Sequence, residues 1–196
     1  MKQIAFFDLD GTITTKDTLL EFLKFSKGKF YFYFAFLLYS PVLVAYKLKI
    51  ISNQTAKEKM LTFFFGDTSL TDFRELCQRF ASEVLPGLLR PKALEEIRQL
   101  QNKGIEVVVV SASLEEWIRP WTDAIGAGLI ATCLEIRNEK LTGKIQGKNC
   151  YGIEKTERIN ASYDLSAYNK IYAYGDTSAD KPMLQLATIS FYKPFR

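Results

Sequence analysis

Two aspartates with the potential for chemistry, Asp8 and Asp10, stand two residues apart in the segment DLDGT. They follow an apolar run, residues 3–7, which predicts a buried strand ending in a functional loop. Because side chains alternate along a strand, this spacing places both carboxylates on one side. Two such charges need a cation or a shared proton, and carboxylate oxygens suit Mg²⁺. Gly11 would let the backbone approach a phosphate and Thr12 adds a hydroxyl, although a solvated acidic turn is the plainer alternative.

Three further segments carry groups suited to the same chemistry. Asp176 and Asp180, in GDTSAD, follow another apolar run and would supply a metal ligand and a carboxylate that supports it; an N-capping aspartate is the alternative. Ser111 ends the run VVVV, where a hydroxyl and backbone N–H groups would either hold phosphate oxygens or cap a helix. Lys155 lies in a predicted helix, YGIEKTERI, and by itself is more typical of a solvated surface charge.

The composition excludes several other chemistries. The 196 residues contain no histidine, which removes Ser-His-Asp and Cys-His catalysis and most transition-metal sites. The three cysteines, Cys77, Cys133 and Cys150, lack CxxC spacing and argue against a disulfide framework or a zinc site. A net charge of +4 with scattered lysines gives no basis for nucleic-acid binding. The N-terminus leads directly into a strand without a signal peptide, so we expect a cytoplasmic protein.

The elements that must position these residues alternate between strands and helices from residue 87 onward. This rhythm predicts an α/β fold with a Rossmann-like parallel sheet and helices on both faces. Helices are expected over residues 91–103 and 151–161. Residues 15–86 carry helical patterns only, so we expect an inserted helical cap there and a core domain of residues 1–14 and 87–196. Strands are expected at residues 3–7, 105–110, 129–132, 170–174 and 188–192, and a hairpin at residues 134–137 and 141–145.

One segment of the expected cap, from Phe30 to Tyr46, contains no charged residue. A spanning helix needs roughly 20 apolar residues, whereas this segment is shorter and contains Pro41. We favour a helix or helix pair buried in the cap; an interfacial surface for membrane or lipid and a true span are the alternatives. The segment is flanked by four lysines, Lys27, Lys29, Lys47 and Lys49.

Together, the four motifs resemble a known family. Their order is strand–DxDGT, strand–Ser, Lys on a helix and strand–GDxxxD, which is similar to the haloacid dehalogenase superfamily of phosphohydrolases. Within it, the chain most resembles the phosphoserine-phosphatase-like branch, subfamily IB, which has a helical cap of the C1 type between the first and second motifs. The match covers residues 1–20 and about 87–196. Residues 111–121 and 131–155 also resemble a subgroup that includes bacterial phosphatidylglycerophosphatases.

The resemblance implies a mechanism and a role for each motif residue. It implies a Mg²⁺-dependent phosphatase that hydrolyses a phosphate monoester through an aspartyl-phosphate, with Asp8 as nucleophile and Asp10 as acid and then base. Mg²⁺ would be held by the Asp8 carboxylate, the Asp10 carbonyl and Asp176, with Asp180 steadying that shell. The phosphoryl oxygens would be bound by Gly11, Thr12, Ser111 and Lys155.

The substrate is less constrained than the mechanism. Phosphoserine phosphatases have SGG where this chain has SAS at residues 111–113, and a cap glutamate near the position of Asp17. Lys57 is a candidate replacement for the arginine that reads the substrate carboxylate in that family. Phosphoserine is therefore not the expected substrate, and a lipid phosphate cleaved at the inner membrane face is one alternative. A non-catalytic module that binds phosphate ligands is another, and phosphoryl transfer to an alcohol also stays open, as does the oligomeric state.

Overall fold

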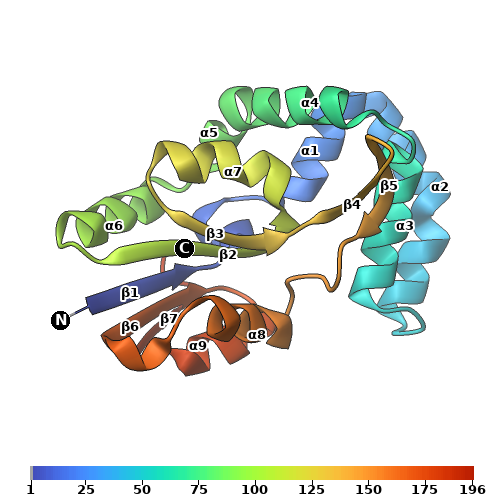
Figure 1. Cartoon of the computed structure of the whole chain (residues 1–196). Helices are drawn as coiled ribbons and strands as arrows, with labels where there is room; N and C mark the ends of the chain where they lie inside the picture. The colour runs from blue at the N-terminus through green and yellow to red at the C-terminus, as the bar shows by residue number, and fades with distance from the viewer. Residues whose placement is uncertain (1) are drawn as a thin grey trace.

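A parallel sheet forms the centre of the computed structural model, which describes residues 2–196 (Figure 1). Its strand order is β3-β2-β1-β6-β7, and all neighbouring strands run parallel. The predicted α/β fold is thereby confirmed. The strands are β1 (Lys2–Phe7), β2 (Glu106–Leu114), β3 (Gly128–Thr132), β6 (Tyr168–Gly175) and β7 (Ile189–Tyr192), and the separate hairpin consists of β4 (Leu134–Arg137) and β5 (Lys140–Ile145).

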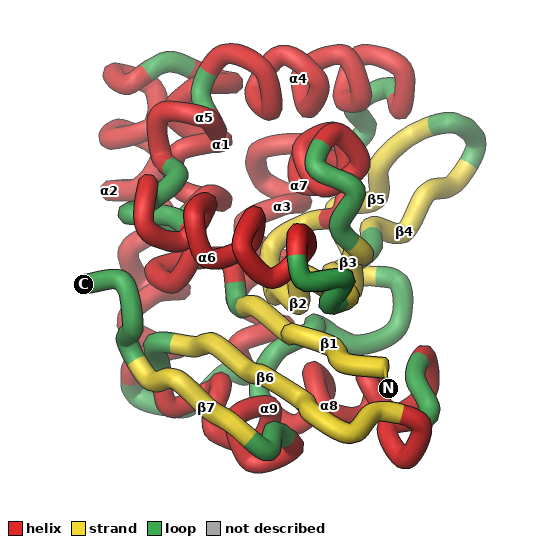
Figure 2. Tube along the Cα trace, turned by 90° about the vertical axis from the view of Figure 1, so that its left-hand side faces the viewer, coloured by secondary structure: helices red, strands yellow, loops and turns green. Residues whose placement is uncertain are grey.

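Helices cover both faces of the sheet, and β1 shows why. Its side chains alternate between two apolar clusters: Ala5 and Phe7 belong to one, Ile4 and Phe6 to the other. Burial on both faces is what a continuous apolar strand predicts. Figure 2 shows helices on both sides of the sheet. They are α6 (Pro91–Asn102) and α7 (Glu115–Ala124) on one side, and α8 (Ile153–Ser162) and α9 (Lys181–Leu186) on the other.

The cap leaves the core after β1 and returns before α6. Its two connections run side by side, because Thr15 N donates to Leu88 O at 2.8 Å and Arg90 N donates to Ile13 O at 2.8 Å. Between them the chain is helical, as predicted. The cap helices are α1 (Thr18–Lys27), α2 (Lys29–Lys47), α3 (Asn53–Phe65), α4 (Leu70–Glu83) and the short α5 (Leu85–Leu88).

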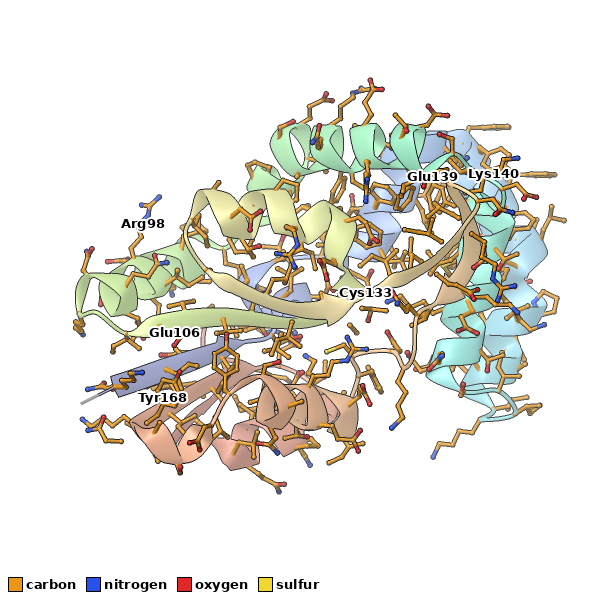
Figure 3. The ribbon with its side chains drawn as sticks, in the orientation of Figure 1. Arg98, Glu106, Cys133, Glu139, Lys140 and Tyr168 are labelled. Atoms are coloured by element: carbon orange, nitrogen blue, oxygen red, sulfur yellow. The ribbon has the colours of Figure 1, made fainter. Side chains whose placement is uncertain are left out.

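The β4–β5 hairpin extends from the core to the cap. Leu70 N donates to Glu139 O at 2.9 Å, and Figure 3 shows Glu139 and Lys140 at the hairpin tip beside the cap. Gly143 has a φ of 76°, and a Cβ there would lie 2.3 Å from Thr62 Cα in α3. Glycine at this position therefore lets β5 pack directly on α3, which ties the cap to the residues that follow β3.

The prediction that the cap buries residues 30–46 is wrong for most of the segment. The segment forms one helix, α2, with Pro41 inside it. Only Phe32, Ala35 and Tyr39 are buried, whereas Phe30 is 90% exposed. Figure 1 shows the reason: α2 lies at the outer edge of the cap, with α3 between it and the hairpin, so one face alone meets other helices.

Candidate active site

Three functional segments meet at the carboxyl ends of neighbouring strands, where ligands bind in open α/β sheets. Asp8 follows β1, Ser111 lies in β2, and Asp176 follows β6. After Asp8 the chain turns sharply through Leu9–Ile13, and Gly11 has a φ of 86°. A Cβ on Gly11 would lie 2.5 Å from Asp176 Oδ2. Glycine is thus required here both by the left-handed backbone and by the approach of the third motif.

Lys155 joins two of the acidic motifs. Its Nζ lies 2.6 Å from Asp8 Oδ1 and 2.7 Å from Asp180 Oδ1, and its side chain is 2% exposed. Burial alone would lower the pKa of Lys155, but the two carboxylates outweigh it and raise the pKa. Burial raises the pKa of Asp8 to about 7 although Lys155 opposes the shift. Lys155 is therefore an internal charge partner and not a solvated surface lysine.

A second feature is a buried cluster of the three carboxylates Asp8, Asp176 and Asp180. One oxygen from each lies within 4.8 Å of the others. Asp180 Oδ2 is held by Thr177, whose N–H donates at 2.9 Å and whose hydroxyl donates at 2.8 Å. Thr12 Oγ1 donates to Asp176 at 3.5 Å, and Arg196 also pairs with that carboxylate. Three carboxylates paired with two cations, Lys155 and Arg196, still leave a net negative charge when ionised, and their hard oxygens suit Mg²⁺.

Asp10 faces a different set of groups. Its Oδ1 accepts from Thr18 N at 2.6 Å, and its Oδ2 accepts from Ser113 Oγ at 2.6 Å. Thr18 Oγ1 in turn donates to Ser113 Oγ at 2.9 Å. Burial, followed by the negative charge of Asp17, raises the pKa of Asp10 to about 6. A carboxyl group held in place with a pKa near neutrality suits proton transfer.

A cavity of about 430 Å³ opens above these groups, between the core and the cap. Asp8, Asp10, Lys155 and Asp180 contribute to one end of it. Most of the remaining wall comes from the cap and is apolar, and includes Leu19, Leu20, Phe36, Leu43, Ala56 and Met60. The substrate would therefore meet charge at the core end and hydrocarbon at the cap end.

The two candidate substrate residues both line this cavity. Asp17 also accepts a hydrogen bond from Leu20 N at 3.0 Å and so caps α1. Lys57 reaches from α3 to the core, where its Nζ donates to Ala112 O and, at 3.3 Å, to Asn149 Oδ1. Burial lowers the pKa of Lys57 to about 8.

The predicted phosphate-binding residues differ in whether they line the cavity. Of the predicted phosphate-binding residues within the described chain, Lys155 alone lines the cavity. Ser111 is fully buried, and its Oγ accepts from Ser113 N at 2.9 Å. Sequence reasoning missed the roles of Thr18, Ser113 and Asn149. The segment SAS offered a signal for Ser113, because a second hydroxyl two residues after Ser111 points to the same side of the strand.

Comparisons with known proteins identify the family to which this chain belongs. The family model for haloacid dehalogenase-like hydrolase matches residues 5–185. Protein CicA of Caulobacter vibrioides is 33% identical over 192 residues, which cover 97% of this chain and 85% of that protein. A probable phosphatase of Mycobacterium tuberculosis is 30% identical over 198 residues, covering 92% of this chain and 65% of that protein.

Solved structures show the same architecture. A protein of unknown function from Bordetella pertussis superposes with a TM-score of 0.85 at 24% identity, covering 97% of this chain and 89% of that one. A substrate-bound phosphoserine phosphatase gives a TM-score of 0.70 at 18% identity, covering 98% and 86%. The predicted phosphoserine-phosphatase-like fold and hydrolase class are confirmed, and this chain belongs to the haloacid dehalogenase-like hydrolase family.

Proposed function

We propose that this hydrolase is a Mg²⁺-dependent phosphatase that cleaves a phosphate monoester through an aspartyl-phosphate on Asp8. The observation that carries the proposal is the buried contact of Lys155 Nζ with Asp8 and Asp180, at 2.6 and 2.7 Å. It holds one oxygen of Asp8 in a fixed position beside a cavity that also receives Asp10. Positioning and charge neutralisation are the main requirements of phosphoryl transfer.

In the first step, an Asp8 oxygen attacks phosphorus and the bond to the ester oxygen breaks. Asp10 gives its proton to the leaving oxygen, which departs as an alcohol. In the second step, Asp10 takes a proton from water, the water oxygen attacks phosphorus, and the bond to Asp8 breaks to release inorganic phosphate. The hydrogen bonds from Thr18 N and Ser113 Oγ keep the Asp10 carboxyl in one orientation through both steps.

The residues around Asp8 fit a magnesium ion. The Asp8 carboxylate, the Asp10 carbonyl and Asp176 would hold it, and Asp180, fixed by Thr177 and Lys155, would steady the arrangement. Magnesium would supply positive charge that offsets the phosphoryl oxygens and the attacking carboxylate. Lys155 would add a second positive charge at the same end of the cavity.

A magnesium-dependent turnover assay with p-nitrophenyl phosphate tests the proposal. We expect phosphate release from wild-type protein, and acid-stable trapping of radiolabelled phosphate on Asp8 from a labelled monoester. Addition of a small alcohol as acceptor would distinguish hydrolysis from phosphoryl transfer. Phosphate binding without release of product would contradict the proposal and favour a non-catalytic module.

A further inference from the structure

The outer face of α2 is an apolar surface that no other part of the chain covers within residues 2–196. Leu37 is 70% exposed and Leu38 is 59% exposed. The exposed apolar residues recur every three or four positions and therefore share one side of the helix. Contiguous surfaces of this kind mark sites of interaction. The α2 outer face consists of Phe30, Tyr33, Phe34, Leu37, Leu38, Pro41 and Val44, together with Leu48, which directly follows the helix.

The charges around this face indicate an anionic partner. The sequence contains no aspartate or glutamate between Glu21 and Glu58. Exposed lysines flank both ends of α2, so positive charge borders the apolar surface: Lys27, Lys29, Lys47 and Lys49. A second copy of this chain would bring like charges together across the contact, which is unfavourable. Apolar residues flanked by lysines are the pattern of helices that bind anionic lipid surfaces.

The helix is long and apolar enough to cross a membrane, but its contacts fix it along the cap. Phe32 and Ala35 are buried, and Tyr39 Oη donates to Ala56 O in α3. Pro41 lacks the N–H that would bond to Leu37 O, and the Ser40 hydroxyl donates to that carbonyl at 2.7 Å. The helix therefore continues through Pro41 and packs against the rest of the cap along one side. This geometry suits a helix lying in the plane of a membrane surface, with its other face in lipid.

The inner side of the same helix lines the catalytic cavity. Phe36, Leu43 and Tyr46 from α2 form part of the wall, together with Met60 from α3. The cavity therefore extends from Asp8 to the helix whose outer face is apolar. A phosphate monoester bound with its phosphorus at Asp8 would lay an attached hydrocarbon chain along this wall, where apolar contact is favourable.

We propose that the α2 outer face docks on an anionic lipid bilayer, and that the site takes phosphate monoesters with an apolar tail from that interface. The docking stands on the α2 contacts alone, whereas the substrate class rests on the proposed phosphatase function. Burial of the outer face in the interfacial region would leave the cavity, on the opposite side of α2, next to the lipid headgroups.

Flotation with vesicles tests the docking. We expect wild-type protein to float with vesicles of equal parts phosphatidylglycerol and phosphatidylcholine, and much less with phosphatidylcholine alone. The double variant Phe34→Ser, Leu37→Ser should bind at least about tenfold more weakly, because both substitutions remove apolar area that would contact the bilayer. Ile136→Ser, at an exposed apolar residue of the hairpin, is the matched control and should bind normally.

A second variant tests how much the flanking lysines contribute to vesicle binding. It keeps the test decisive if the double serine variant fails to fold. Lys29→Gln with Lys49→Gln changes exposed residues only. It should weaken vesicle binding and reduce its dependence on salt. Equal binding of wild type and both sets of variants would overturn the docking. So would a dimer that these variants dissociate, because the surface would then be a contact between copies.

Turnover separates this inference from the proposed function. All the docking variants should hydrolyse soluble p-nitrophenyl phosphate at the wild-type rate. The Phe34→Ser, Leu37→Ser variant should lose activity on lysophosphatidic acid in vesicles in parallel with its loss of binding. An inactive wild-type protein that still binds vesicles would defeat the phosphatase proposal only. A wild-type protein that cleaves p-nitrophenyl phosphate but prefers glycerol 3-phosphate to lysophosphatidic acid would overturn the substrate class.

Discussion

Ser113 Oγ lies 2.6 Å from Asp10 Oδ2 and donates a hydrogen bond to it. The contact joins the end of β2 to the first motif and fixes the carboxyl group that we assign to proton transfer. Ser113→Ala should lower kcat by about tenfold or more with little change in KM, because hydrogen bonds to charged groups contribute about 1.5–3 kcal/mol. Steady-state kinetics with p-nitrophenyl phosphate provide the measurement. Ser166→Ala, at an exposed serine, is the control, and equal kinetics in the two variants would contradict the assignment.

Asp8→Asn should abolish turnover while preserving the fold. The amide keeps the size of the side chain but cannot act as the attacking group, so activity should fall by several powers of ten. Burial already disfavours the charged form of Asp8, whose pKa is raised to about 7. Lys155 keeps Asp180 as its partner at 2.7 Å in this variant, so the Tm at pH 8 without magnesium should be unchanged or higher. Near-normal turnover in this variant would exclude Asp8 as nucleophile, and Asp123→Asn on the surface of α7 is the control.

Lys155→Ala should cost both activity and stability. The sequence suggested a lysine whose removal leaves the fold intact, but the structure buries it between Asp8 and Asp180. Removal of one partner from a buried ion pair typically costs about 3–5 kcal/mol. We expect a clear fall in Tm without magnesium, together with loss of turnover. Lys144→Ala, at an exposed residue of β5, should change neither, and an equally mild result at Lys155 would refute its internal role.

Magnesium should stabilise the protein through the carboxylate cluster. Excess chelator should abolish turnover, and Mg²⁺ should restore it better than Ca²⁺, which prefers more ligands at longer distances. A metal that binds the folded state only raises the Tm, so calorimetry with and without Mg²⁺ measures binding apart from activity. Asp176→Ala should remove that shift more completely than Asp180→Ala. Full activity in chelator would refute the metal requirement.

Lys57 should make kcat/KM fall at alkaline pH. Burial lowers the pKa of Lys57 to about 8, so the side chain loses its charge as the pH rises through that value. If Lys57 attracts an anionic substrate, wild-type kcat/KM should fall above about pH 8, because kcat/KM reports groups of the free enzyme. Lys57→Met should have a lower kcat/KM at pH 7 and no such fall. Lys59→Met, on the exposed side of α3, should follow the wild-type profile.

The sequence by itself determined the fold, the order of the motifs and the residues at the strand ends. Apolar runs such as β1 are buried on both faces, so the pattern placed Asp8 and Asp176 each at the carboxyl end of a parallel strand, and the family resemblance implied that they meet at one site. The helical content of residues 15–86 could also be predicted from the sequence, because it depends on local hydrophobic periodicity.

Only the tertiary structure decided which side chains are buried and which distant residues they contact. Taken by itself, Lys155 was more typical of a surface charge, and only the family resemblance assigned it to the site, because its burial depends on Asp8 and Asp180, which are distant in the chain. Residues 30–46 were expected in the cap core because the segment is short, contains Pro41 and lies inside a cap that needs its own core. Their exposure follows from the position of α2 at the outer edge of the cap, which depends on how many helices pack around it. Periodicity shows that a helix forms, whereas burial is set by long-range packing that no local pattern records.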